Sequence, residues 1–229
     1  MLIHTAHGQA FQNLDFEDSS IVTSIPFGNG FNGGTADVPG WTSYNAYGDV
    51  NYSGGMTLIY DDRTLDEPTV ALWDSSLTTP LQGQYSIFMY GGSGFAGVSH
   101  TNAAIGQTGQ IPVTAKSITY LAQGLETLEV SFKGQMLSVS PIATTPNYTV
   151  YGADISAYAG QTGELLFNID ASVGGTGLLD DIQFSASPVP EPDWLGFFVL
   201  GGLLLGSGRL LQTFRNPKRN LACSISRRV

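Results

Sequence analysis

Alternating apolar and polar positions recur along residues 11–187, between short stretches rich in Gly, Pro, Asn and Asp. In residues 128–133 every second side chain is apolar, and the same period of two recurs in 117–120 and 165–170. A period of two gives a strand one buried face and one wet face. Further candidate strands are 70–73, 85–90, 148–152 and 179–185.

Many short strands with turn residues between them predict an all-β fold. Residues 154–159 fit a single helical turn, and the chain shows no internal repeat of fixed period. We therefore expect residues 11–187 to form one antiparallel β-sandwich, of the jelly-roll kind.

The pattern changes after residue 193. Residues 194–208 carry no charge, and the apolar stretch continues past Arg209 to Phe214. About 20 apolar residues span a bilayer as a helix, and an arginine near the end can extend to the interface. We expect a transmembrane helix over 194–214. The alternative is a buried core helix with a basic end, which the glycines of this stretch disfavour.

The charges are divided along the chain in the same way. Residues 1–208 contain all nineteen acidic residues and only three of the nine lysines and arginines, and residues 209–229 contain the other six. Positive residues after a membrane span favour the cytoplasm. The membrane stop is therefore predicted at Arg209, Arg215, Lys218 and Arg219, with 215–229 as a basic cytoplasmic tail and the acidic body outside.

Composition narrows the class of protein. Charged residues make up 12% of the chain, about half of the usual ~25%. The chain is instead rich in glycine, with 29 glycine residues. This profile is typical of an exported β-protein. The acidic body would repel phosphate, so we expect no nucleic-acid partner. The one cysteine, Cys223, lies in the tail, so the body has no thiol for zinc, disulfide or nucleophilic chemistry.

A proline-rich linker, residues 188–193, separates the body from the apolar stretch. Val189, Pro190, Glu191 and Pro192, the glycine-rich span and the arginine cluster together resemble the PEP-CTERM sorting signal of exopolysaccharide-producing Gram-negative bacteria. The resemblance implies that a membrane-embedded cysteine protease, exosortase, recognises the motif and removes the anchor during export. Asp193 and the long tail depart from the family pattern without touching the motif.

An exported chain needs a signal at its start, yet residues 1–10 are too short and too polar for one. Gly8, Gln9 and Ala10 resemble the small-residue end of a signal peptide that is cleaved before Phe11. We expect residues 1–10 to be the remnant of a signal peptide whose start is misassigned or truncated. A disordered N-terminal segment of a protein exported by another route is the alternative.

The body itself resembles galactose-binding-like jelly rolls, the fold of many carbohydrate-binding modules. The resemblance rests on Leu14-Asp15-Phe16-Glu17, on Gly40-Trp41 and on the closing Asp180-Asp181-Ile182. It implies that the first and last strands lie side by side, with a structural calcium ion between them held by Glu17, Asp180 and Asp181. Calcium takes 6–8 oxygen ligands, so backbone carbonyls would supply several of them. The alternative is that these acids are solvated strand-end residues.

Aromatic residues are the candidates for sugar stacking. Trp41 and Trp73 are expected in the core or at its rim, because large aromatic side chains bury well. Tyr44 and Tyr47, in the glycine-rich stretch 41–55, are the better candidates for an exposed ligand-binding face.

Catalysis is not expected. If residues 1–10 are removed, His100 is the remaining histidine, and no serine-elbow motif accompanies it. Asp61-Asp62 and Asp66-Glu67 fit a turn or a calcium loop better than a glycosidase pair.

The sequence thus predicts a periplasmic body on an inner-membrane anchor, exported to the cell surface or matrix as a structural or polysaccharide-associated protein. Its expected partners are the secretion machinery, exosortase, the inner membrane before processing, and exopolysaccharide. The alternatives are a carbohydrate-binding module and a glycan hydrolase.

Overall fold

Alternating runs become strands along most of the described chain. A computed structural model describes residues 8–27, 31–45, 57–60, 69–76, 78–91, 102–125, 127–169 and 175–189, all within the unit Met1–Pro190. The strands are β1 (Ser20–Phe27), β2 (Phe31–Asp37), β3 (Thr42–Asn45), β4 (Thr57–Tyr60), β5 (Thr69–Asp74), β6 (Tyr85–Tyr90), β7 (Ala103–Gln110), β8 (Ser117–Gln123), β9 (Leu128–Phe132), β10 (Gln135–Met136), β11 (Val139–Thr144), β12 (Thr149–Asp154), β13 (Thr162–Ile169) and β14 (Thr176–Ser185). Within these ranges the helix content is one short 3-10 turn, η2 (Ser156–Tyr158).

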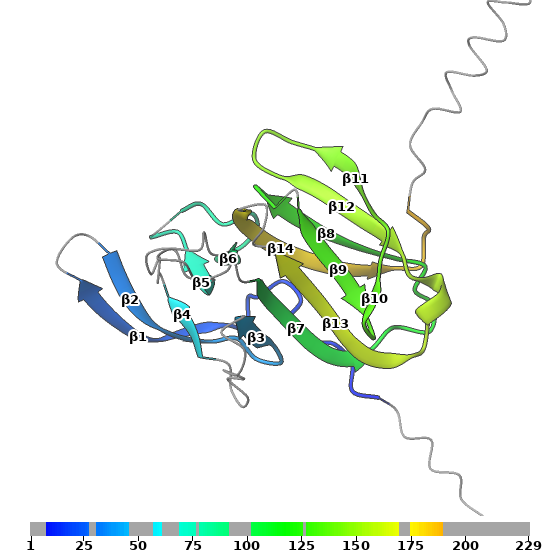
Figure 1. Cartoon of the computed structure of the whole chain (residues 1–229), viewed down its shortest axis with the longest axis horizontal. Helices are drawn as coiled ribbons and strands as arrows, with labels where there is room; N and C mark the ends of the chain where they lie inside the picture. The colour runs from blue at the N-terminus through cyan, green and yellow to red at the C-terminus, as the bar shows by residue number, and fades with distance from the viewer. Residues whose placement is uncertain are drawn as a thin grey trace, which may run out of the picture. The chain divides into compact units, whose positions relative to one another are not determined.

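The strands form antiparallel sheets, as the sequence predicted. One sheet has six strands in the order β11-β12-β8-β14-β6-β5, and a second has five in the order β10-β9-β13-β7-β3 (Figure 1). Strands β1, β2 and β4 form a separate three-stranded sheet. All pairings between these strands are antiparallel. Some strands pair with their neighbours in sequence, such as β5 with β6 and β11 with β12. The last two strands pair with strands that come much earlier in the chain: β13 pairs with β7 and β9, and β14 pairs with β6 and β8.

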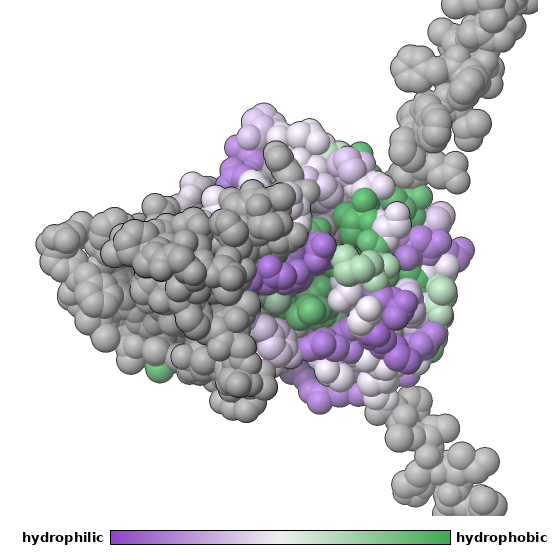
Figure 2. Space-filling view, viewed as in Figure 1, coloured by the Kyte–Doolittle hydropathy of each residue, from purple (hydrophilic) through white to green (hydrophobic). Residues whose placement is uncertain are grey.

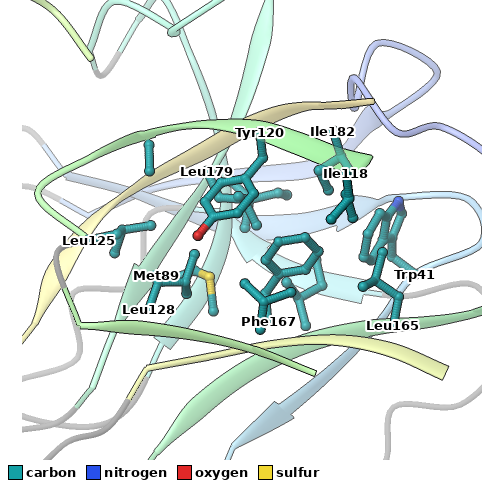
Figure 3. Close-up of a cluster of buried hydrophobic side chains, with 14 of the residues drawn as sticks. Trp41, Met89, Ile118, Tyr120, Leu125, Leu128, Leu165, Phe167, Leu179 and Ile182 are labelled. Atoms are coloured by element: carbon teal, nitrogen blue, oxygen red, sulfur yellow. The ribbon is translucent and has the colours of Figure 1, made fainter. Parts of the chain in front are cut away.

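The inner faces of the two larger sheets share one hydrophobic core. Ile118 and Tyr120 of β8 and Leu179 of β14 contribute from one sheet, and Leu165 and Phe167 of β13 contribute from the other. Figure 3 shows these side chains pointing toward one another between the ribbons. Phe167 is fully buried, and its replacement by alanine would cost about 3–5 kcal/mol. The described chain is therefore β-sandwich-like and all-β.

Both tryptophans considered for sugar stacking are buried, as expected. Trp41 lies in the main core, where its ring contacts Phe16 and Phe167. Trp73 lies in a second cluster with Ala71, Phe88 and Leu178. Its ring stacks on Phe88 with centroids 4.0 Å apart. Neither indole is available to stack on a sugar.

The second cluster lies on the outer face of the six-stranded sheet. Side chains alternate between faces along a strand, and Ile87 and Met89 of β6 already point into the main core. Phe88 therefore points outward, and Leu81 of the β5–β6 connection packs against its cluster. The exposed large hydrophobic residues, by contrast, are scattered, and Figure 2 shows green hydrophobic atoms lying among purple hydrophilic ones on the visible face.

The predicted membrane segment is not part of the described chain. Residues 194–214 and the tail 215–229 lie outside the described residues. Among the residues that are described, no helix is long and apolar enough to cross a membrane. Of the linker, Pro188 and Val189 are described and form no strand or helix.

Candidate functional site

The N-terminal segment is folded by its own polar side chains. Asn13 Oδ1 accepts a hydrogen bond from the Asp18 amide at 2.9 Å, and Asn13 Nδ2 donates to Ser19 Oγ at 3.1 Å. The Trp41 indole donates to the Asn13 carbonyl at 2.9 Å, and Phe16 is fully buried. This turn fixes the position of Glu17, which directs its carboxylate at the connection between β5 and β6.

Glu17 holds that connection through its backbone. The Gln84 amide donates to both carboxylate oxygens of Glu17, at 2.9 and 3.0 Å, and the Tyr85 amide donates to Oε1 at 3.2 Å. Gly83 has φ +60°, and a Cβ atom there would overlap the Glu17 carboxylate. Glycine is therefore required where the chain turns under the carboxylate.

Asp180 of β14 holds the same connection from a buried position. Its Oδ2 accepts hydrogen bonds from the Gln82 amide at 3.0 Å and from Ser86 Oγ at 2.8 Å. Its Oδ1 accepts from the Asp181 amide at 2.7 Å. Burial raises the pKa of the Asp180 carboxyl to about 7, because the charged form loses solvation, although these hydrogen bonds act in the opposite direction.

Asp181 lies in a bulge of β14. The register between β14 and β8 shifts between Asp180 and Gln183, and Asp181 has φ 45°. The Asp181 carboxylate accepts from Gln183 Nε2 at 2.7 Å and, with the Gln82 amide group turned to donate, from Gln82 at 2.8 Å. The bulge also frees the Ile182 amide, which donates to the Leu14 carbonyl at 2.9 Å.

The three acids predicted as calcium ligands therefore gather around the β5–β6 connection. We call Glu17, Asp180, Asp181 and the segment 81–86 the carboxylate clasp. Its acidic oxygens face N–H and O–H donors, whereas calcium needs 6–8 oxygen atoms with free lone pairs. Within the described ranges, no three His, Cys, Asp or Glu side chains are grouped to hold a metal. This donor set does not fit calcium as it stands, and calcium binding stays a prediction for solution tests.

Tyr44, the described candidate for ligand binding, lies on the outer face of the five-stranded sheet. The strand register sets Tyr44 of β3 opposite Ala104 of β7, Ala104 opposite Asn168 of β13, and Asn168 opposite Glu129 of β9. The neighbours of these residues along each strand, such as Ile105 and Phe167, are buried in the core. The four residues therefore point outward together, and we call them the polar row.

A hydrogen bond crosses this face above a glycine. Tyr44 Oη donates to Glu164 Oε1 at 2.7 Å, and burial, followed by the effects of Glu164, raises the pKa of Tyr44 to about 12. A Cβ atom on Gly106 of β7 would lie 3.2 Å from Glu164 Oε1 and 3.0 Å from Leu166 Cδ1. The small residue leaves room for the Glu164 side chain to cross β7 and reach Tyr44.

A second polar pair lies at the other end of the row. Asn168 Nδ2 donates to Glu129 Oε2 at 3.0 Å. Glu129 is exposed, while Asn168, Glu164 and Tyr44 are half-buried. The period of two had placed Glu129 and Asn168 on the wet faces of their strands. The sequence contained no signal for their register with Tyr44 or for Glu164, because register is set by long-range pairing.

The remaining predicted site residues are only partly described. Val189 of the sorting motif is half-buried. Tyr47, Pro190, Glu191, Pro192 and the basic residues of the membrane stop lie outside the described residues, as do His100 and the acidic pairs of the 61–67 stretch.

No family model, no curated protein and no solved structure is significantly similar to this chain.

Proposed function

We propose that this chain is an exported surface or extracellular-matrix protein, sorted through a PEP-CTERM-type C-terminal signal and associated with polysaccharide. The observation that carries the proposal is the order of three elements: Val189-Pro190-Glu191-Pro192, an apolar stretch over 194–214, and a basic cluster after it. Each element has a role in one export step. The motif is the recognition site for exosortase, the apolar stretch holds the precursor in the inner membrane, and the basic cluster fixes its orientation.

The proposal extends to the body of the protein. We assign it a galactose-binding-like jelly roll, followed by a single transmembrane helix that is removed on maturation. The bond between the Ile182 amide and the Leu14 carbonyl supports this assignment in part, since it joins the first segment of the body to its last strand. The first strand itself, β1, pairs with β2 in a separate sheet and not with β14, which departs from the pattern that the resemblance implies. No catalytic activity is assigned to it.

Intact-mass analysis of the protein secreted by its native host tests the sorting step. The expected mature chain ends near Pro190–Pro192 and lacks the apolar stretch. A matched host carrying Glu191→Ala should retain the uncleaved chain in its membrane fraction. A secreted chain that still ends at Val229 would contradict the proposal.

A carbohydrate-binding module with a specific glycan ligand is the second candidate function. It is favoured by Tyr44, whose ring lies on a sheet face beside Glu164 and in register with Asn168. A glycan array probed with the full-length chain in mild detergent tests it. Binding that is lost in Tyr44→Ala supports the module, and an array without any bound glycan contradicts it.

A further inference from the structure

The outer face of the five-stranded sheet offers hydrogen-bond acceptors more than donors. Of the described residues, none donates to Glu164 Oε2, to Glu129 Oε1 or to Asn168 Oδ1, while the opposite oxygens of both glutamates are occupied. The Tyr44 hydroxyl already donates to Glu164. A ligand on this face therefore meets acceptor atoms that have lone pairs to spare.

The middle of the same face is built on small residues. Ala104 and Gly106 of β7 are buried there, and the Glu164 and Leu166 side chains lie close above Gly106. The polar row crosses four strands, and strands lie about 4.8 Å apart, so the row is about 14 Å long. The Tyr44 ring closes one end and the Asn168–Glu129 pair closes the other.

Charge decides which ligand suits these atoms. The cationic residues in the described ranges are Lys116 and Lys133. Lys116 adjoins β8 of the other sheet, and Lys133 Nζ donates to Gln161 Oε1 at 3.2 Å, beyond the start of β13. Neither described lysine forms an ion pair with Glu129 or Glu164, although the Lys133 amide donates to the Glu164 carbonyl at 2.9 Å. Carboxylate or sulfate groups on a ligand would be repelled, whereas neutral hydroxyl groups donate to carboxylates through strong charge-assisted bonds.

We propose that the outer face of the five-stranded sheet binds a neutral polysaccharide, which lies along the polar row and the adjacent Glu164, with sugar hydroxyls donating to Glu164, Asn168 and Glu129. The Tyr44 ring provides a flat apolar surface for one sugar ring, and its hydroxyl keeps the Glu164 carboxylate in place. The inference rests on the second function proposed above and names its ligand class and site.

Affinity electrophoresis of the full-length chain in a mild nonionic detergent tests the proposal. The gels contain a neutral soluble polysaccharide, either a mixed-linkage glucan, a galactomannan or a dextran, or an acidic one, either alginate or polygalacturonate. Each gel is run with EDTA and with calcium. At least one neutral polysaccharide should retard the chain equally in both conditions, and neither acidic polysaccharide should retard it.

Variants locate the binding. Tyr44→Ala and Asn168→Ala should each weaken the retardation by about tenfold, equivalent to about 1.4 kcal/mol. Tyr148→Ala, which removes a half-buried tyrosine from the β11–β12 turn of the other sheet, should leave it unchanged. Melting temperatures of all variants establish that a loss of retardation is not a loss of folding. If Tyr44→Ala unfolds, Tyr44→Phe and Asn168→Ala carry the test.

The outcomes separate the ligand class from the function. Tyr44-dependent retardation by an acidic polysaccharide, with or without calcium, would overturn the neutral-ligand inference and keep the module. If Tyr44→Ala and Asn168→Ala are both retarded as strongly as the unmodified chain, the assigned site is overturned. No retardation by any of these polysaccharides would overturn the inference. Cleavage at the sorting motif, measured by intact mass, is independent of all three results.

Discussion

The outer faces of the two main sheets use carboxylates in opposite ways. On the six-stranded sheet, Asp180 is fully buried and all of its described contacts are with donors of the fold itself. On the five-stranded sheet, Glu129 and Glu164 each have one oxygen bonded to a neighbour and one without a described donor. The residue types are nearly the same, but Asp180 is fully buried, whereas Glu164 is half-buried and Glu129 is exposed.

The difference arises from what the chain does after each strand. The connection from β5 to β6 folds back over its sheet, with Leu81 in the second cluster and the amides of Gln82, Gln84 and Tyr85 on the clasp. Backbone amides that do not pair with another strand need other acceptors, and the carboxylates of Glu17 and Asp180 provide them here. On the polar row the strands satisfy their own amides, so the carboxylates there are available for other partners.

The largest expected effect on stability is at Asp180, the buried carboxylate of the six-stranded sheet. Asp180→Ala removes the acceptor of two amides and of the Ser86 hydroxyl, so it should lower the free energy of unfolding by about 3 kcal/mol. Urea denaturation at pH 5 measures it. The control is Asp154→Ala, which removes an exposed acceptor of the Ser156 amide and should cost less than about 1 kcal/mol. Equal small losses in both variants would contradict the structural role of the clasp.

Stability should also fall as the pH rises from about 4 to about 7. The pKa of Asp180 is about 7 in the folded chain against 3.8 for the unperturbed group, so the folded state binds the proton more tightly. Between these values the folded state holds more protons, and unfolding becomes easier as they are lost. We expect a decrease on the order of 1 to 3 kcal/mol, measured by urea denaturation at half-unit steps.

The pH profile has its own control. Asp180→Asn cannot ionise, so its stability should change less over this range than that of the unmodified chain. A profile that rises between pH 4 and pH 7, or one that is the same in Asp180→Asn, would contradict the assignment.

Glu17 gives a smaller effect because its bonds lie nearer the solvent. Glu17→Ala should lower the free energy of unfolding by about 1–2 kcal/mol, and Glu17→Gln, which keeps one acceptor, by about half as much. Hydrogen exchange should become faster at the Gln84 and Tyr85 amides in both variants. Asp18→Ala, at the neighbouring exposed position, is the control and should leave these amides protected. Unchanged exchange in Glu17→Ala would show that the carboxylate does not hold the connection.

Gly106→Ala tests the outer face of the five-stranded sheet at a net cost of about 1 kcal/mol. The added methyl group costs roughly 1–3 kcal/mol in a packed site, and alanine regains about 0.5–1 kcal/mol over glycine within a strand. The added methyl group would press on Glu164 Oε1 and Leu166 Cδ1, and the ends of both side chains can move aside. The Tyr44–Glu164 bond should break, so retardation by the neutral polysaccharide should weaken while the fold persists. Tyr148→Ala, in the β11–β12 turn of the other sheet, is the control and should be retarded as strongly as the unmodified chain. Full retention of binding in Gly106→Ala would show that the bridge is not needed.

The smallest expected effect is at Glu129, where the substitution already proposed for Glu17 can be made on the other sheet. Glu129→Gln should change the free energy of unfolding by less than about 0.5 kcal/mol, because its amide oxygen still accepts from Asn168 at an exposed position. The same substitution at Glu17 should cost more. If urea denaturation gives both substitutions the same effect, the two faces do not differ as described.

Much of the strand pattern was predictable from local alternation. The runs in β5, β6, β8, β9, β13 and β14 were predicted close to their bounds. β8, β9 and β13 begin or continue with apolar residues at every second position, whereas β5 and β6 are short apolar runs that are buried on both faces. The single helical turn predicted over 154–159 is η2 (Ser156–Tyr158). The run 148–152 is β12, displaced to Thr149–Asp154. These elements carry their signal within a few residues.

Other strands lack that signal. β7 reads Ala-Ala-Ile-Gly-Gln-Thr-Gly-Gln, with small and amide side chains where β-branched ones are usual. It is a strand because β13 and β3 supply hydrogen bonds on both sides. β11 contains Pro141, which an edge strand tolerates. Neither could be inferred without knowing its neighbours.

The candidate sites show the same limit. The motif around Glu17 and the Asp180-Asp181 pair led correctly to one region of the fold, but their donors come from the β5–β6 connection, which no motif marked. Tyr44 was singled out as an exposed aromatic residue, whereas its partner Glu164 is 120 residues away. Such contacts follow from sheet register, which local patterns do not specify.

The place of β14 in its sheet has a mechanical consequence. This last strand lies between β8 and β6, and β6 pairs with its first half while β8 pairs with it up to Ser185, where the chain continues toward the linker at Pro188. Its final residues, Gln183 to Ser185, pair with Thr119 to Ser117 of β8. Antiparallel hydrogen bonds run perpendicular to the strands. Tension applied through the linker along β14 would therefore load several of these bonds in shear at once, whereas an edge strand can be peeled away one bond at a time.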